Sequence, residues 1–338
     1  MVRRGPAPGS RDWQRMQRRR QREDRGGQRR RTGREQPDPK PFVWIPVSAQ
    51  KSPQRQKDFP QHDMFVEGLI TAQFELKFTV LSDYLFVGSG GWEVTKDGRA
   101  YRTFYRRGDD ICIPATSIKG AVRAAYEAIT NSCVSQIDPK DKKKPPKGYL
   151  RCKFRESSDP LCPACRLFGT TGYAGRIRFS DALPLRKTEP KIVQIFDLFP
   201  PRKEQGRKFY AHGKAAVVDG PPQRNHRFVE AVEGNTEFRT TVTVFNAEYA
   251  ELAALFVSMG LLDLNGRRIE VKIGGAKPRC FGTVRFELLD GKDWEGKTIQ
   301  KEELFAELRN ALSLVDMEAF NILADATYEL PNCPRRLY

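Results

Sequence analysis

Residues 69–82 read Leu-Ile-Thr-Ala-Gln-Phe-Glu-Leu-Lys-Phe-Thr-Val-Leu-Ser, and this stretch sets the class of fold. Apolar and polar residues alternate along it, with the apolar ones at Phe74, Leu76, Phe78 and Val80. A period of two predicts a strand that is buried on one face. A glycine-rich stretch follows, and we expect residues 83–110 to form an inserted polar loop.

The segment after this loop predicts an amphipathic helix. Ile111-Cys112-Ile113-Pro114 is a short extended piece, and Thr116 or Ser117 can cap the helix that follows it. Lys119 and Arg123 are four residues apart and share one face. The apolar positions of the helix fall on another face, at Ile118, Ala121, Val122, Ala125 and Ile129.

The remaining elements complete an α+β pattern. Periodicity predicts strands at 175–182, 238–245, 269–273 and 283–288, and helices at 247–259 and 301–315. The order strand, helix, strand, strand, helix, strand predicts a ferredoxin-like, or RRM-like, split βαβ core. We place this core at 41–290, with large inserts at 83–110, 132–168 and 185–235, and a helical extension at 291–338.

The charge of the chain points to a polyanionic partner. The 338 residues carry a formal net charge of +17, which favours nucleic acid over an anionic membrane surface. Residues 1–40 hold fourteen Lys and Arg against five Asp and Glu, and we expect them to form a disordered Arg-rich tail. Such a tail is either a solvated segment or a phosphate-binding arm. The rest of the chain carries the other eight positive charges, so the core is basic as well.

Targeting signals are not evident in the sequence. No run of 18 apolar residues predicts a transmembrane helix, and the N-terminus lacks the apolar region of a secretory signal. We therefore expect a cytoplasmic protein without a membrane partner.

Four of the seven cysteines have the spacing of a metal site. Cys133 is followed by Cys152 after eighteen residues, by Cys162 after nine more and by Cys165 after another two. A Cys-Pro-Ala-Cys turn directs two thiolates at one cation, and two further thiolates complete a tetrahedral zinc site. Four thiolates leave no position for an activated water, so the predicted zinc is structural and holds a polar insert together. Unligated cysteines and a redox pair are the alternatives.

The other three cysteines are predicted to be single. An odd number of cysteines in a chain without a secretion signal argues against a disulfide framework. Cys112 and Cys280 lie in apolar, strand-like segments and are expected in the core, whereas Cys333 is expected as a free thiol near the C-terminus.

Two further motifs have the composition of phosphate-binding segments. The start of the predicted helix, with Ser117 and Lys119, presents N–H groups, a hydroxyl and a charge. Gly274-Gly275-Ala276-Lys277-Pro278-Arg279-Cys280-Phe281-Gly282 combines glycines that allow close backbone approach, two cations and a ring for stacking. Each motif alone is also consistent with an ordinary capped helix or an exposed hairpin turn.

Together these blocks resemble the RAMP superfamily of CRISPR proteins. Ile113-Pro-Ala-Thr-Ser-Ile-Lys-Gly-Ala-Val-Arg123 resembles the signature IPGSSIKGALR, with Ala115 in place of a glycine. Cys162-Pro-Ala-Cys-Arg-Leu-Phe-Gly169 and Gly175-Arg-Ile-Arg-Phe-Ser-Asp-Ala182 resemble its second block, and 274–282 resembles its glycine-rich loop, interrupted by Pro278. The resemblance spans about residues 69–288.

The resemblance implies a guide-binding subunit of a type III CRISPR effector complex, either repeated along the backbone or at its end. CRISPR RNA, target RNA and other effector subunits would then be its partners. Carried over position by position, the guide contacts are Ser117, Lys119, Arg123, Gly274, Gly275, Lys277 and Arg279. Phe168, Gly169 and Asp181 are expected to support the fold instead.

The resemblance also raises the question of catalysis. Relatives often cut target RNA with an aspartate in the loop after the first strand, and Asp97 is nearest to the expected spacing. Such a site would use a divalent metal such as Mg²⁺ only if it is catalytic. A Lys-Asp-Gly turn at 96–98 is the alternative explanation for this aspartate.

Two other functions remain open. A processing nuclease of the same superfamily would cut guide precursors with a base such as histidine. No histidine is near either motif in the sequence. His62, His212 and His226 are expected at the surface, with contact to RNA as the alternative for His212. A zinc-containing RNA-binding module outside CRISPR systems is the other alternative.

Overall fold

The computed structural model describes residues 40–47, 51–135, 146–198, 206–325, 329–330 and 333. These residues belong to one compact unit, Asp38–Tyr338. The Arg-rich stretch predicted to be disordered lies outside the described residues, except for Lys40.

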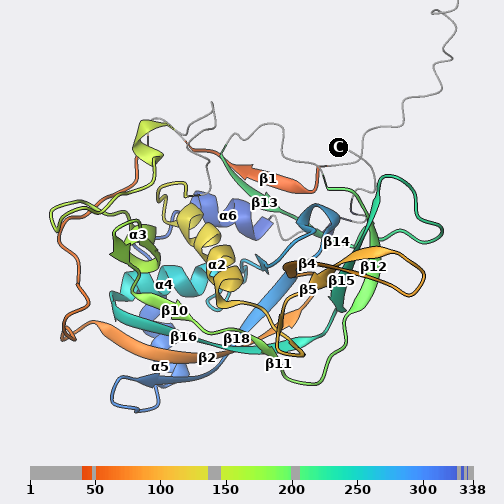
Figure 1. Cartoon of the computed structure of the whole chain (residues 1–338). Helices are drawn as coiled ribbons and strands as arrows, with labels where there is room; N and C mark the ends of the chain where they lie inside the picture. The colour runs from red at the N-terminus through yellow and green to blue at the C-terminus, as the bar shows by residue number, and fades with distance from the viewer. Residues whose placement is uncertain are drawn as a thin grey trace, which may run out of the picture. The chain divides into compact units, whose positions relative to one another are not determined.

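The centre of the unit is an antiparallel sheet with the strand order β10-β16-β2-β18-β17, and β11 also pairs with β16. Its strands are β2 (Ile70–Val80), β10 (Ile177–Phe179), β11 (Leu183–Pro184), β16 (Glu237–Ala247), β17 (Val271–Lys272) and β18 (Thr283–Asp293). Two helices, α2 (Ala115–Ile129) and α4 (Tyr249–Ser258), lie over one face of it (Figure 1). The predicted α+β class is confirmed, and the order β2, α2, β10, β16, α4, β18 is the predicted order of elements.

The alternation in β2 explains why the helices cover that face. Ala72, Phe74, Leu76, Phe78 and Val80 are buried, whereas the residues between them are more exposed. The ring of Phe78 lies between Phe238 of β16 and Phe286 of β18, at centroid distances of 5.3 and 5.1 Å. Aromatic residues in register on adjacent strands thus make the base of the core.

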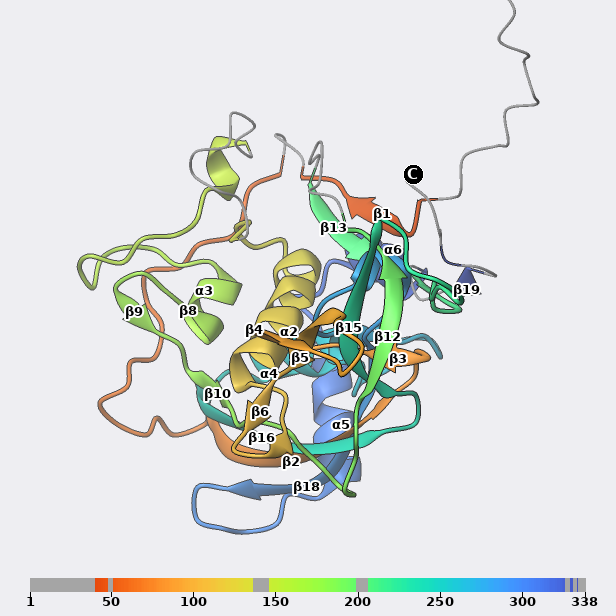
Figure 2. The ribbon, with the colours of Figure 1, turned by 45° about the vertical axis from the view of Figure 1, so that its right-hand side comes forward.

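A second sheet forms from segments that sequence reasoning treated as inserts. Its order is β12-β15-β5-β4, and β3 also pairs with β15 (Figure 2). The strands are β3 (Tyr84–Leu85), β4 (Gly88–Val94), β5 (Ala100–Phe104), β12 (Lys191–Phe196) and β15 (His226–Glu233). The segment 83–110, expected as a loop, therefore contains a β4–β5 hairpin. In the 185–235 insert, β12 and β15 pair antiparallel.

Short paired strands and helices connect these sheets. The strand pairs are β1 (Phe42–Ile45) with β13 (Arg207–Tyr210), β6 (Arg106–Arg107) with β7 (Asp110–Ile111), β8 (Gly169–Thr170) with β9 (Tyr173–Ala174), and β14 (His212–Gly213) with β19 (Glu329–Leu330). The short helix α3 (Pro163–Phe168) carries the Cys-Pro-Ala-Cys turn. The helix predicted at 301–315 ends earlier, as α5 (Lys301–Asn310). A second helix, α6 (Met317–Asp325), follows it.

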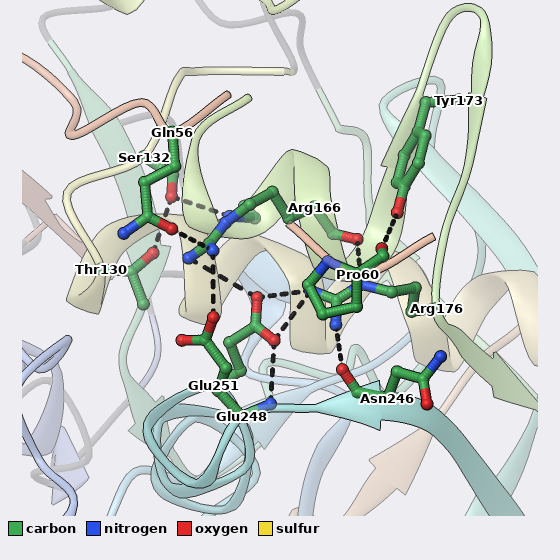
Figure 3. Close-up of polar contacts among 11 residues, drawn as sticks. Gln56, Pro60, Thr130, Ser132, Arg166, Tyr173, Arg176, Asn246, Glu248 and Glu251 are labelled. Carbon is green, nitrogen blue, oxygen red and sulfur yellow. Dashed lines mark hydrogen bonds and ion pairs between the residues drawn. The ribbon is translucent and has the colours of Figure 1, made fainter. Parts of the chain in front are cut away.

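A buried ionic cluster joins α3 and β10 to the start of α4 (Figure 3). The side chains of Arg166, Arg176 and Glu251 are almost completely buried. Glu251 accepts from Arg176 Nη2 at 2.6 and 2.8 Å, and Arg166 Nη2 lies 3.6 Å from it. Glu251 also completes a capping box with Glu248, so one carboxylate fixes both the helix start and the two arginines.

Candidate nucleic-acid interface and metal centre

The start of helix α2 is fixed by a hydrogen bond to a residue outside the helix. Pro114 is its N-cap, and Asp181, which follows β10, accepts a hydrogen bond from Ala115 N at 2.8 Å. The prediction that Thr116 or Ser117 caps the helix is therefore wrong, because both lie inside the first turn. An acidic side chain at a helix N-terminus is favoured by the unpaired N–H groups and the helix dipole. Asp181 thus supports the fold, as expected from the resemblance.

The glycine-rich loop packs against the main chain of Phe86. Gly275 N donates to Phe86 O at 2.7 Å. Gly274 has φ +80°, and a Cβ there would lie 2.1 Å from the same oxygen. Only glycine fits this position, so the pair of glycines fixes where the loop runs. Lys277 and Arg279 follow in a short 3₁₀ turn.

A groove of about 440 Å³ lies between the first turns of α2, the glycine-rich loop and β13. The α2 wall consists of small side chains, and a Cβ added at Gly120 would meet no atom within 4 Å. This explains why there is space beside the helix. The functional groups along the groove are Ser117, Lys208, His212, Glu270, Lys272, Gly275 and Lys277. The carboxylate of Glu270 forms an ion pair with Arg285 and lies 3.7 Å from His212 Nε2.

Burial lowers the pKa values of two lysines of the groove, Lys272 and Lys277. Burial, followed by the charge of Lys277, lowers the pKa of Lys272 to about 7, and burial lowers the pKa of Lys277 to about 8. Within the described ranges, no carboxylate forms an ion pair with either ammonium. A phosphate would compensate both charges. Sequence reasoning missed Lys272 and Lys208, which lie in segments without a motif.

His212 also lines the groove, contrary to the expected surface position. Its side chain is buried, its Nδ1 lies 2.5 Å from Thr283 Oγ1, and burial, then Lys272 and Arg285, lowers its pKa to about 3. The imidazole is therefore neutral at physiological pH. The argument that no histidine lies near the two motifs is corrected: strand β14 brings His212 to them.

Of the seven carried-over residues, Ser117, Gly274, Gly275 and Lys277 line the groove. Lys119 Nζ donates instead to Ile177 O at 3.0 Å. Arg123 forms an ion pair with Glu127 at 2.7 Å and donates to Gly169 O at 2.9 Å.

The end of the glycine-rich loop also turns inward. Arg279 is buried and donates to Asp197 O at 2.9 Å. Phe281, considered for stacking on a base, is fully buried against Tyr84 at a centroid distance of 5.4 Å. The ring is therefore part of the core between the loop and β3.

Asp97 lies in the β4–β5 turn, away from this groove. Gly98 N donates to Thr95 O, and the Asp97 carboxylate accepts from Thr95 Oγ1 and pairs with Arg99 at 2.7 Å. The Thr95 hydrogen bond, the largest influence, lowers the pKa of this carboxyl. Asp97 lines a different pocket, of about 410 Å³, that also includes Arg99 and Lys191.

The four predicted metal ligands converge. The sulfur atoms of Cys133, Cys152, Cys162 and Cys165 all lie within 4.8 Å of one another, and all four side chains are buried. Hydrogen bonds from the other three thiols lower the pKa of Cys162, with Cys133 the largest influence. Four sulfur donors around one point can hold a tetrahedral Zn²⁺, and no other residue type joins the group within the described part of the chain.

The charges around the cysteines fit such a site. Arg123 Nη2 lies 3.7 Å from Cys165 Sγ. Arg207 is buried, bonds the carbonyl of Ser132 and has no ion pair among the described residues. Its Nε has no hydrogen-bond partner there either. A zinc ion with four thiolates carries two negative charges. Arg207 would offset part of this charge, and so would Arg123, whose own charge is shared with Glu127.

The structure corrects the prediction for the remaining cysteines. Cys280 is buried as expected, but it forms a disulfide with Cys333, so Cys333 is not a free thiol. Ala216 packs against both. The bond joins the glycine-rich loop to the C-terminal segment. Cys112 is a buried free thiol, in agreement with the prediction.

Comparison with known families agrees with this arrangement. A family model described as the RAMP superfamily matches residues 77–320, which include the α2 motif, the cysteine-bearing helix and the glycine-rich loop. The chain belongs to the RAMP superfamily. RAMP proteins are CRISPR-associated and generally bind CRISPR RNA in complexes of several subunits. A search of curated proteins found no significant match.

None of the helices in the described part of the chain is both long enough and apolar enough to cross a bilayer.

Proposed function

We propose that this RAMP protein is a guide RNA-binding structural subunit of a type III CRISPR effector complex in the prokaryotic cytoplasm. Its partners would be CRISPR RNA, the target RNA that pairs with it, and neighbouring effector subunits. The observation that carries the proposal is the groove that brings the first turn of α2 and the glycine-rich loop together. A strand held there by its phosphates would leave its bases free to pair.

The architecture supports the same proposal. The strand order β10-β16-β2-β18, with α2 and α4 as the two crossovers, is that expected of a ferredoxin-like, or RRM-like, core. We propose that Ser117, Gly275, Lys272 and Lys277 contact the guide phosphates. Lys119, Arg123 and Arg279 would act on the RNA only indirectly, because their side chains bond other parts of the protein.

We further propose that the four cysteines hold a structural zinc ion. Helix α2 connects this centre to the groove, since Ser117 lies in its first turn and Cys133 follows its last turn. Arg123, between the two, contacts both Glu127 and Cys165. The metal would thereby fix the end of the helix whose beginning lines the groove.

Removal of the two groove lysines tests the phosphate contacts. Lys272→Met/Lys277→Met should bind single-stranded RNA more weakly. The slope of log affinity against log salt should become shallower by about 1.4 if each lysine contacts one phosphate, at ~0.7 per contact. A matched control is Lys51→Ala/Lys297→Ala, which removes two exposed lysines from surface ion pairs. Equal affinities and slopes for the two variants would refute the groove.

RNA processing is a second candidate because His212 lines the groove. A base with a pKa of about 3 would be a weak proton acceptor at neutral pH, which favours the structural role. Incubation of the purified chain with repeat RNA decides between them. Specific cleavage that is lost in His212→Ala would establish the processing nuclease.

Target cleavage through Asp97 is a separate hypothesis with its own test. The carboxylate would have to exchange its bonds to Thr95 and Arg99 for a ribose hydroxyl or a metal-bound water. If Asp97 is catalytic, the assembled complex with Asp97→Ala loses target-RNA cutting but keeps target binding. Unchanged cutting would leave Asp97 as a turn residue.

A further inference from the structure

The β4–β5 hairpin begins at the groove and carries an exposed tryptophan. Val87 and Gly88, where β4 starts, line the groove, and every residue of β4 is exposed. Trp92, four residues farther along, keeps 55% of its surface exposed. An RNA strand that leaves the groove on this side would run along β4 and reach Trp92. The strand β4 rises about 3.3 Å per residue, and Trp92 is only four residues from Gly88.

Trp92 is backed by a cation. The pairing of β4 with β5 places Arg102 directly opposite Trp92, and the guanidinium lies 4.9 Å from the centre of the indole ring. No carboxylate in the described segments forms an ion pair with Arg102. The nearby Glu93 belongs to the opposite face of the hairpin, where it accepts a hydrogen bond from Tyr101. The Trp92 face is thus aromatic and positively charged.

We propose that Trp92, oriented by Arg102, stacks on an unpaired base of the RNA whose phosphates occupy the groove. This inference rests on the proposed function. An aromatic face binds any nucleobase, and the guanidinium meets the adjoining phosphate, so the pair selects single-stranded RNA without selecting sequence. Continuity with the groove and the positive charge favour RNA over a protein partner as the occupant.

A second exposed tryptophan provides a matched control. Trp294 is 61% exposed and stacks on Phe65 at 5.3 Å. It follows the last residue of β18, whereas the groove lies near the first residue, Thr283, which pairs with Lys272. The length of β18 therefore separates Trp294 from the groove by about 30 Å. Loss of Trp294 removes an equally exposed indole that the RNA would not touch.

The test compares full-length Trp92→Ala, Trp92→Phe and Trp294→Ala in binding a labelled single-stranded RNA. We expect Trp92→Ala to bind on the order of tenfold more weakly, with an unchanged salt slope because no phosphate contact is lost. Trp92→Phe should recover most of the affinity, and Trp294→Ala should match the unaltered chain. Irradiated 5-iodouridine RNA should crosslink to the peptide that contains Trp92.

Three outcomes would overturn the inference. Equal affinity of Trp92→Ala and the unaltered chain would exclude the stacking. Loss of affinity in Trp294→Ala as well would mean that aromatic residues act through stability. Unchanged RNA affinity with lost association of neighbouring subunits would make Trp92 a protein contact. These results differ from failure of the proposed function itself, in which the Lys272→Met/Lys277→Met variant also binds RNA normally.

Discussion

Arg176 and Glu251 form a two-point ion pair, with Nη2 of the arginine 2.6 and 2.8 Å from the two carboxylate oxygens, where neither side chain is exposed. Arg166, from the same block of sequence as the cysteines, lies beside the same carboxylate. The pair joins the residue before β10, a strand that follows the cysteine segment, to α4 on the central sheet. The carboxylate of Glu251 therefore fixes the position of the cysteine-bearing segment against the core.

Glu251→Gln should therefore lower the free energy of unfolding by roughly 3–5 kcal/mol, because it leaves the buried guanidinium of Arg176 without its anion, while Arg166 keeps its ion pair with Glu248. Urea denaturation measures this. Glu295→Gln is the control, since Glu295 pairs with Lys297 at the surface and its loss should cost under about 1 kcal/mol. Similar effects of the two substitutions would show that the buried cluster contributes no special stability.

The metal proposal predicts about one zinc ion per chain, since all four thiol groups meet at one point. Cys162→Ser should lose the metal and lower the melting temperature, and a chelator should do the same to the unaltered protein. Cys112→Ser, at a buried free cysteine outside the cluster, should keep the metal. A folded, metal-free protein with unaltered stability would refute the zinc centre.

The lysines of the groove predict a pH dependence of RNA binding. Their folded pKa values of about 7 and 8 mean that both lose their charge as the pH rises from 6.5 to 9. Affinity for single-stranded RNA should fall over this range in the unaltered protein. It should fall much less in Lys272→Met/Lys277→Met. An equal pH dependence in both proteins would assign the effect to other groups.

The same pKa shifts affect stability in the opposite direction. Unfolded lysines keep their protons up to about pH 10.4, so the unfolded chain binds more protons between about pH 7 and that value. These two groups therefore favour the folded state increasingly as the pH rises through this window. Below pH 7 they are charged in both states and their burial is unfavourable, so Lys272→Met should raise the free energy of unfolding at pH 6. Urea denaturation at pH 6 and pH 9 measures this, and a variant that is less stable at pH 6 would contradict it.

The disulfide predicts that Cys333→Ala is less stable than the unaltered chain by about 2–4 kcal/mol. Cys280 and Cys333 are 53 residues apart, and closing a loop of this size restricts the unfolded chain. Denaturation without reductant measures the loss. Identical curves for the two proteins, with thiol titration showing two more free thiols than expected, would mean that the bond does not form.

The periodicity of apolar residues predicted the strands and helices that form the core. It gave no prediction for strands that lack an apolar face. The alternation around Phe74 and Phe78 identified β2, and the spacing of Ile118 and Val122 identified α2. The β4–β5 hairpin was expected as a loop because β4 is glycine-rich and exposed along its whole length, so it has no apolar face to give a signal. The disulfide was missed since pairing of Cys280 with Cys333 depends on where the C-terminal segment runs.

The candidate site was predicted in part for a similar reason. Local motifs located Ser117 and the glycine-rich loop, whose backbone conformations depend on nearby sequence. His212 could not be found in this way, because it comes to the groove from sixty residues before Lys272 in the chain. Lys272 is only two residues before Gly274, but the alternation of residues 269–273 predicts an exposed side chain there, whereas it is buried. The Arg123–Glu127 ion pair joins residues four apart on the predicted helix and was within reach of sequence reasoning. The bond from Arg123 to Gly169 O was not, because these residues are 46 apart in the chain.

The central claim is that the groove holds the sugar–phosphate backbone of a guide RNA. Sequencing of the RNA that co-purifies with the native assembly tests it most directly. We predict small RNAs that share one 5′ end derived from a CRISPR repeat, and their depletion when the assembly carries Lys272→Met/Lys277→Met. An assembly without RNA, or with fragments of unrelated 5′ ends, would contradict the account.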